Sequence, residues 1–135
     1  MAKSQVDIPV YSIVFDPAIA ATASGRLAKK TTPITKEKAL DVGKDYAALV
    51  RAHIDPDALV FVFGSTVTGN ANLDSDIDIA VVSKTNDSAI YDAFATLSIL
   101  ADEVSWDIEV HVIATTDWHK GDPHVLEIQR HGIAV

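Results

Sequence analysis

The stretch FGSTVTGNANLDSDIDIAVV, residues 63–82, joins the end of one apolar segment to the start of another and carries several carboxylates between them. Residues 58–63 (ALVFVF) lead into it as six consecutive apolar residues, too few for an independent helix and followed directly by Gly64. Such a run predicts a strand that is covered on both faces. Residues 77–82 (IDIAVV) predict a second strand, so we expect these two strands to form the centre of the fold.

Segments with helical periodicity lie on both sides of these strands. Residues 36–53 place apolar side chains at the spacing of one helical face, with Thr35 in position to cap the helix. Residues 88–103 predict a second helix, and the turn residues 85–88 (TNDS) are expected to cap it. The apolar face predicted for this second helix consists of Ile90, Phe94, Leu97, Ala101 and Val104.

A third strand is predicted over residues 106–113 (WDIEVHVI), because apolar and polar residues alternate there. Its apolar side is Ile108, Val110 and Val112, and its polar side is Asp107, Glu109 and His111. Residues 124–131 predict a short helix that ends at Gly132 and is followed by an apolar tail. This order of elements predicts an α/β (α+β) domain with a mixed β-sheet and helices packed on it.

The length and composition of the chain are those of one domain. With 135 residues, 48% of them apolar, the chain is long enough to bury a core. We expect the domain itself to span residues 35–135. Residues 1–34 are interpreted as an N-terminal arm, in which a strand-like stretch at 6–15 precedes a linker rich in Ala, Ser, Thr and Gly.

Charge and residue usage exclude several classes of protein. The formal net charge of -8, from 19 acidic and 11 basic residues, argues against a broad nucleic-acid surface. The one basic cluster, at residues 26–30, is interpreted as a solvated segment. The chain has no cysteine, which excludes disulfides and thiolate metal sites. No apolar run approaches the roughly 18 residues of a membrane span, so we expect a soluble, cytoplasmic protein.

Two carboxylates, Asp76 and Asp78, are spaced two residues apart at the start of the second strand. Side chains at this spacing leave a strand on the same face, and like charges held there repel unless a metal ion or a proton intervenes. Magnesium suits such a pair, since carboxylates hold it while water and substrate phosphates fill the other positions. Asp107 and Glu109 on the third strand offer a further carboxylate.

A glycine-serine pair, Gly64 and Ser65, directly follows the first strand. Glycine allows a phosphate to approach the backbone, and the serine adds a hydroxyl beside exposed N–H groups. Gly69 permits the chain to turn back towards the aspartates. These residues together favour binding of a nucleoside triphosphate whose charge is met by magnesium.

Two common motifs with a similar sequence pattern do not fit this segment. A P-loop begins with the spacing of Gly64 and Gly69, but Asn70 and Ala71 stand where it requires Lys and then Ser or Thr. Alternating aspartates also begin a calcium-binding loop, but Ile79 replaces its glycine and Thr85 its bidentate glutamate. Neither motif explains the segment.

The segment GSTVTGNANLDSDID resembles the G-S-x-x-x-G and S-D-I-D signature of minimal nucleotidyltransferases in the DNA polymerase beta superfamily. The resemblance covers about residues 40–135. It implies that Asp76 and Asp78 hold magnesium and that a third carboxylate helps to activate an attacking hydroxyl. The residues that match the signature are Gly64, Ser65, Gly69, Ser75, Asp76, Ile77 and Asp78.

The third acid is Glu109 or Asp107, because both lie on the polar side of the same predicted strand. The register after Glu109 resembles the family strand more closely, so Glu109 is favoured as catalytic residue and metal ligand. His111 shares this face, whereas His119 and His124 are interpreted as loop or surface residues. The nucleotide-binding residues implied by the resemblance are Gly64, Ser65, Gly69 and Ser75.

The resemblance implies a nucleotidyltransferase that uses Mg²⁺ to move a nucleoside monophosphate from a nucleoside triphosphate, with ATP expected, to a hydroxyl of an acceptor. Val67 and Thr68 stand where many relatives carry Ala-Arg, so a cation that would face the phosphates is missing. The alternative is a non-catalytic nucleotide- or metal-binding module. Minimal nucleotidyltransferases often work beside a HEPN-type partner in toxin–antitoxin pairs, so a partner of that type or a homodimer is expected.

Overall fold

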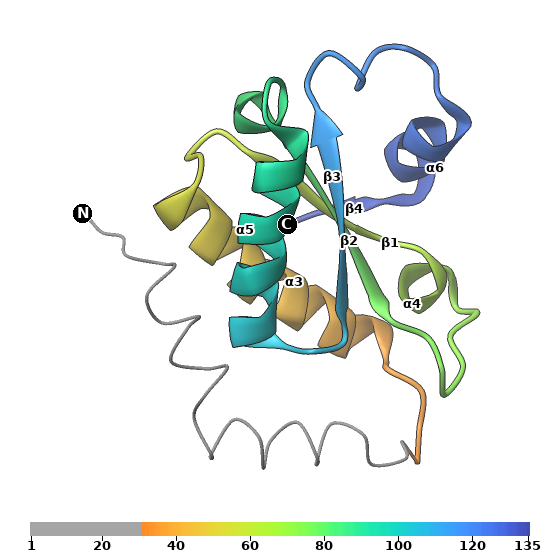
Figure 1. The fold of residues 1–135 in the computed structure, drawn as a ribbon. Coiled ribbons are helices and arrows are strands. Elements are labelled where there is room, and N and C mark those ends of the chain that lie inside the picture. The colour runs from red at the N-terminus through yellow and green to blue at the C-terminus, as the bar shows by residue number, and fades with distance from the viewer. Residues whose placement is uncertain (1–30) are drawn as a thin grey trace. The chain divides into compact units, whose positions relative to one another are not determined.

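The structure, a computed structural model, describes residues 31–135 (Figure 1). The predicted strand at 6–15, most of the predicted arm and linker, and the basic cluster at 26–30 lie outside the described residues. The helices are α3 (Lys36–His53), α4 (Ser65–Thr68), α5 (Ile90–Val104) and α6 (Pro123–His131), with a 3-10 turn η1 (Lys84–Asn86). The strands are β1 (Leu59–Phe63), β2 (Ile77–Ser83), β3 (Ile108–Ala114) and β4 (Ile133–Ala134). Among the described helices, none is both long and apolar enough to cross a membrane.

The four strands form one mixed sheet in the order β3-β2-β1-β4, which confirms the predicted fold class. β1 runs antiparallel to β2 and β4, whereas β2 and β3 are parallel. β4 was not predicted, because the last residues were expected to be only an apolar tail. They instead pair with β1, and the side chain of Arg51 donates from Nη2 to the carbonyl oxygen of Val135 at 2.8 Å.

Helices cover both faces of the sheet (Figure 1). α3 and α5 pack side by side on one face, where the Tyr46 hydroxyl donates to the carbonyl oxygen of Leu97 at 2.7 Å. On the other face, α6 contributes two buried side chains to a cluster with residues of the strands. The members of this cluster are Phe63, Ala80, Val82, Ile113, Val125 and Ile128. Because α6 covers only part of this face, the opposite end of β2 and β3 is left for polar side chains.

α3 has the bounds and the cap that the sequence predicts. The Thr35 hydroxyl accepts from the N–H of Lys38 at 3.1 Å. Gly43 lies in the middle of this helix, where glycine normally weakens a helix by about 1 kcal/mol. A Cβ at Gly43 would collide with the Val62 side chain, so the glycine allows α3 to approach β1 closely.

The start and the buried face of α5 differ from the prediction. The helix begins at Ile90 with Ala89 as its N-cap, and no side chain caps it, so the capping role predicted for residues 85–88 is wrong. Ile90 and Phe94, two members of the predicted apolar face, are 38% and 49% exposed, so this face is not the one that the helix buries. The residues of α5 that are buried are Ala93, Leu97, Leu100 and Ala101.

Asn86, in the segment expected to cap α5, connects two strands instead. Its side chain is fully buried, and Nδ2 donates to the carbonyl oxygens of Val81 and Ile113, each at 3.0 Å. These two bonds satisfy the amide nitrogen and link β2 to β3, whereas Oδ1 of Asn86 has no hydrogen-bond partner among the described residues. This side chain therefore supports the parallel pair of strands on which the candidate site is built.

Candidate functional site

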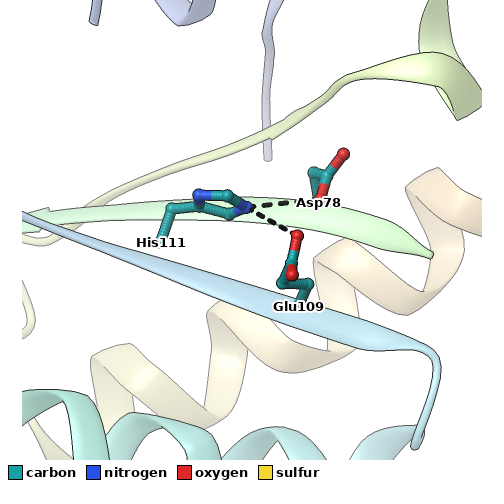
Figure 2. A group of neighbouring side chains, drawn as sticks. All are labelled: Asp78, Glu109 and His111. Carbon is teal, nitrogen blue, oxygen red and sulfur yellow. Dashed lines mark hydrogen bonds and ion pairs between the residues drawn. The ribbon is translucent and has the colours of Figure 1, made fainter. Parts of the chain in front are cut away.

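Three polar side chains gather where β2 and β3 begin (Figure 2). Asp78 of β2 pairs in register with Glu109 of β3, and His111 follows two residues later on β3. Since alternate residues of a strand point to the same face, this register brings all three side chains together. The strand pairing thus confirms that His111 shares the acidic face.

The imidazole of His111 lies between the two carboxylates (Figure 2). Its Nε2 is 3.3 Å from Oδ1 of Asp78 and 3.2 Å from Oε1 of Glu109. One ligand atom from each of the three residues lies within 4.8 Å of the other two. This spacing allows one cation to contact all three side chains.

The pKa of each side chain in this group is changed by the other two. Burial raises the pKa of Asp78, but hydrogen bonds with His111 and Glu109 outweigh it, so this pKa lies below its usual value. The hydrogen bond with Asp78, followed by burial, raises the pKa of Glu109. Burial lowers the pKa of His111, but its interactions with Asp78 and Glu109 outweigh this and leave the pKa raised. The imidazole therefore offsets part of the repulsion between the two acids.

The turn after β1 lies directly against this group. Gly64 has φ 81° and ψ -159°, a backbone conformation that is essentially restricted to glycine. A Cβ at this position would collide with Oδ2 of Asp78. Ser65 then opens the four-residue helix α4, and Gly69, with φ 84°, ends it and turns the chain back. The Gly-Ser segment and the carboxylates are thus neighbours in space.

The other predicted nucleotide-binding residue, Ser75, lies in the loop that leads into β2. Its hydroxyl accepts from the N–H of Asn72 at 2.9 Å, while the Asn72 side chain accepts from the N–H of Asp74 at 2.8 Å. These bonds hold the turn from which the chain enters the strand. The structure therefore gives Ser75 a part in shaping the loop.

Two of the predicted acids lie just before the strands. Asp76 was expected within a strand, but β2 begins at Ile77, and the Asp76 side chain is exposed. Asp107 likewise precedes β3, and its carbonyl oxygen accepts from the N–H of Ile77 at 2.8 Å. The group formed by Asp78, Glu109 and His111 includes neither of them.

Two rings lie beside the imidazole of His111. The ring of Phe63 lies edge-on to it at a centroid distance of 4.8 Å, and the ring of His124 lies at 5.2 Å. His124 belongs to the first turn of α6 and is exposed, as expected of a surface residue. Its position beside His111 was not predicted, because no spacing along the sequence shows that α6 packs against this face.

The donor set of this group fits a divalent cation. Carboxylates are the ligands that Mg²⁺ and Mn²⁺ prefer, and a neutral imidazole can add a nitrogen ligand. The glycine at position 64 leaves room for the carboxylate of Asp78, where any other residue would obstruct it. The residues present are therefore compatible with a metal ion beside a phosphate-binding turn.

A mixed sheet with helices on both faces and an acidic group beside a Gly-Ser turn defines a domain of the nucleotidyltransferase type. The family described as nucleotidyltransferase domain matches residues 47–134, and the chain belongs to this family. The matched residues include all four strands and the whole candidate site. Members of this family act on nucleoside triphosphates and typically use a divalent metal ion. A search of curated proteins found no match.

Proposed function

We propose that this domain uses Mg²⁺ to transfer a nucleoside monophosphate from a nucleoside triphosphate, ATP being the expected donor, to a hydroxyl of an acceptor molecule. The observation that carries the proposal is the pairing of Asp78 and Glu109 on neighbouring strands, directly beside the Gly64 turn. Carboxylates in this position can hold the cation that accompanies a triphosphate. Membership of the nucleotidyltransferase family supports the class of reaction.

In this proposal, Asp78 and Glu109 bind the cation. Asp76, the residue directly before β2, is a further ligand. A bound cation would offset the charge of the phosphates. The triphosphate would lie along the turn formed by Gly64, Ser65 and Gly69, next to the loop that Ser75 shapes. The turn supplies backbone N–H groups, which bind phosphate without a side chain.

Glu109 is proposed to receive the proton of the acceptor hydroxyl. Its side chain is 58% exposed, so a hydroxyl from another molecule can reach it. The hydroxyl oxygen forms a bond to the α-phosphorus as its proton passes to the carboxylate. The bond from the α-phosphorus to the β-phosphate oxygen breaks, and pyrophosphate leaves. Asp107, outside the group, is the second choice for this role.

The same exposure of Glu109 supports an acceptor that is delivered by another molecule. We propose a partner protein, with a HEPN-type protein as the first choice from the resemblance and a second copy of the chain as the other. The test is to incubate the purified chain with α-labelled nucleotides, Mg²⁺ and a lysate of its own host, and then to identify what becomes labelled. The Asp78→Asn variant provides the control, and labelling that persists in it would refute the proposal.

The second candidate function is binding of a nucleotide and metal without catalysis, as an antitoxin-like module would do. The composition of the turn favours binding without catalysis, because no cationic side chain lies between Gly64 and Gly69, where many relatives carry an arginine. Release of pyrophosphate separates the two candidates. A chain that binds ATP with Mg²⁺ and releases no pyrophosphate, in the presence of host lysate, would be a binding module.

A further inference from the structure

The candidate metal site offers an imidazole nitrogen as well as carboxylate oxygens. We propose that His111 is a metal ligand beside Asp78 and Glu109, and that the site consequently binds Mn²⁺ more tightly than Mg²⁺. This inference rests on the proposed function, since it concerns the cation of the same site. It adds a ligand that neither the acidic signature nor the family match assigns.

The distances within the group support shared coordination. In a six-coordinate site with bonds of about 2.1 Å, neighbouring ligand atoms lie about 3 Å apart. Nε2 of His111 lies 3.3 Å from the Asp78 oxygen and 3.2 Å from the Glu109 oxygen, close to that separation. A cation can therefore contact all three atoms with small movements of the side chains.

The orientation of the His111 ring is set by its neighbours. Phe63 packs edge-on against the ring, and the ring of His124 lies 5.2 Å from it. Nε2 points to the carboxylates (Figure 2). The ring is three-quarters buried, so it has less freedom to turn away than an exposed side chain. Ligation uses the lone pair of Nε2 and leaves the proton of the neutral ring on Nδ1. The ring is thus already placed for metal binding.

The choice of ion follows from the mixed ligands. Mg²⁺ is a hard cation that takes oxygen ligands and gains little from imidazole. Mn²⁺ accepts the same carboxylates as Mg²⁺. As a first-row transition ion it also binds an imidazole nitrogen more readily than Mg²⁺ does, although less strongly than Fe²⁺, Cu²⁺ or Zn²⁺. Replacing one water or oxygen ligand by His111 therefore favours Mn²⁺ over Mg²⁺. With carboxylates alone, the site would discriminate less between the two ions.

The proposal is tested on the full chain with MnCl₂ as the probe. Electron paramagnetic resonance of free Mn²⁺ gives its dissociation constant, and competition gives that of Mg²⁺. We expect the dissociation constant of Mn²⁺ to be lower than that of Mg²⁺. Spin-echo modulation of bound Mn²⁺ is expected to show coupling to a ¹⁴N nucleus of His111.

Two variants locate the nitrogen ligand. His111→Gln should remove the ¹⁴N coupling and most of the preference for Mn²⁺, while Mg²⁺ affinity changes little. His119→Gln is the matched control, because His119 is an exposed histidine in the loop before α6, and it should keep both properties. If His111→Gln fails to fold, the spectrum of the unmodified chain still decides whether nitrogen binds the ion.

The outcomes separate this inference from the proposed function. Equal affinities for the two ions and no ¹⁴N coupling, with binding that is lost in Asp78→Asn, would overturn the role of His111 and leave the proposed function standing. Failure of the unmodified chain to bind either ion would count against both. A ¹⁴N signal that survives in His111→Gln would also overturn the inference, since the nitrogen would then come from another residue.

Discussion

Gly64 and Asp78 lie in contact at the centre of the candidate site, so closely that a Cβ on the glycine would overlap the carboxylate oxygen Oδ2. The two residues are neighbours because Phe63, which precedes the glycine, pairs in register with Asp78 across β1 and β2. The turn after β1 thus has its backbone beside the acid proposed to bind the metal. The glycine is required both for its backbone conformation and for the space it leaves.

Replacement of this glycine should therefore damage the site as well as the fold. Gly64→Ala forces a side chain into a backbone conformation that costs about 1–3 kcal/mol and pushes the Asp78 carboxylate aside. We expect lower stability in urea and a large loss of Mn²⁺ or Mg²⁺ affinity in calorimetry. Gly121→Ala is the matched control, with φ 77° and no atom within 4 Å of the added Cβ. It should lose stability and keep metal affinity, and equal metal affinity in both variants would contradict the argument.

The choice between the two candidates for the third acid can be tested by paired substitutions. Glu109→Gln should lower the rate of pyrophosphate release by about a hundredfold or more, the usual loss when a general base is removed. Asp107→Asn should have a much smaller effect, because Asp107 lies outside the group formed with Asp78 and His111. Nucleotide affinity, measured by calorimetry, should change little in Asp107→Asn. In Glu109→Gln it should fall much less than the rate does, because Asp78 is still present to hold the cation. The reverse ranking of the two rates would move the role to Asp107.

The packing of α3 against α5 depends on one buried phenol. The Tyr46 hydroxyl donates to the carbonyl oxygen of Leu97 at 2.7 Å, and burial raises the pKa of Tyr46 well above its usual value, so the hydroxyl keeps its proton. Tyr46→Phe should lower the free energy of unfolding by about 0.5–1.5 kcal/mol in urea titrations. Tyr91→Phe removes the same atom from a side chain that is 88% exposed and should change stability by less than about 0.5 kcal/mol. Equal losses would mean that the buried bond contributes nothing specific.

Asp55 should make part of the stability dependent on acid pH. Its carboxylate accepts from the Ser83 hydroxyl at 2.5 Å and from the Asp57 N–H at 2.8 Å, and these bonds, that of Ser83 first, lower the pKa of Asp55. Because the pKa of Asp55 is lower in the folded state than in the unfolded state, the ionised carboxylate stabilises the folded chain. This stability is fully present above the pKa of the unfolded state, near 4. It is lost as the pH falls through the lower pKa of the folded state.

The Asp55→Asn variant should therefore lose stability less steeply below about pH 4 than the unmodified chain, as followed by urea unfolding across pH. Asp41→Asn removes a carboxylate from the exposed side of α3 and serves as the control. An acid dependence that is identical in all three proteins would show that the bonds to Asp55 do not contribute to it.

Much of the fold could be predicted because local signals are strong there. The bounds of α3 follow from apolar spacing together with the Thr35 cap, and both are determined by residues within a few positions of one another. β1 and β2 follow from short apolar runs that end at glycine or begin at an acidic turn. The signature from Gly64 to Asp78 also indicated the family. The residues of this signature are close together in the sequence, and their combination is typical of one kind of reaction.

The predictions made from the sequence are wrong where contacts between distant residues outweigh the local pattern of apolar and polar residues. The last residues form β4 because β1 has a free edge beside them, which no residue in the tail reveals. α5 buries Ala93 and Leu100 and leaves Phe94 half exposed, because the position of α3 selects the face that is covered. Residues 85–88 predict a turn, yet the buried side chain of Asn86 donates to the carbonyl oxygen of Val81 in β2 and to that of Ile113, which lies 27 residues further along the chain in β3.

The sequence by itself determined which residue types the site contains, because the carboxylates, glycines and serine lie in one short motif and on one alternating strand. Tertiary structure alone decided which of them meet. The parallel register of β2 and β3 places Asp78 opposite Glu109, leaves Asp76 and Asp107 before the strands, and brings His111 between the two acids. The packing of α6 adds His124 beside that ring. Distances between side chains depend on strand pairing and helix packing, which are set by contacts between residues far apart in the chain.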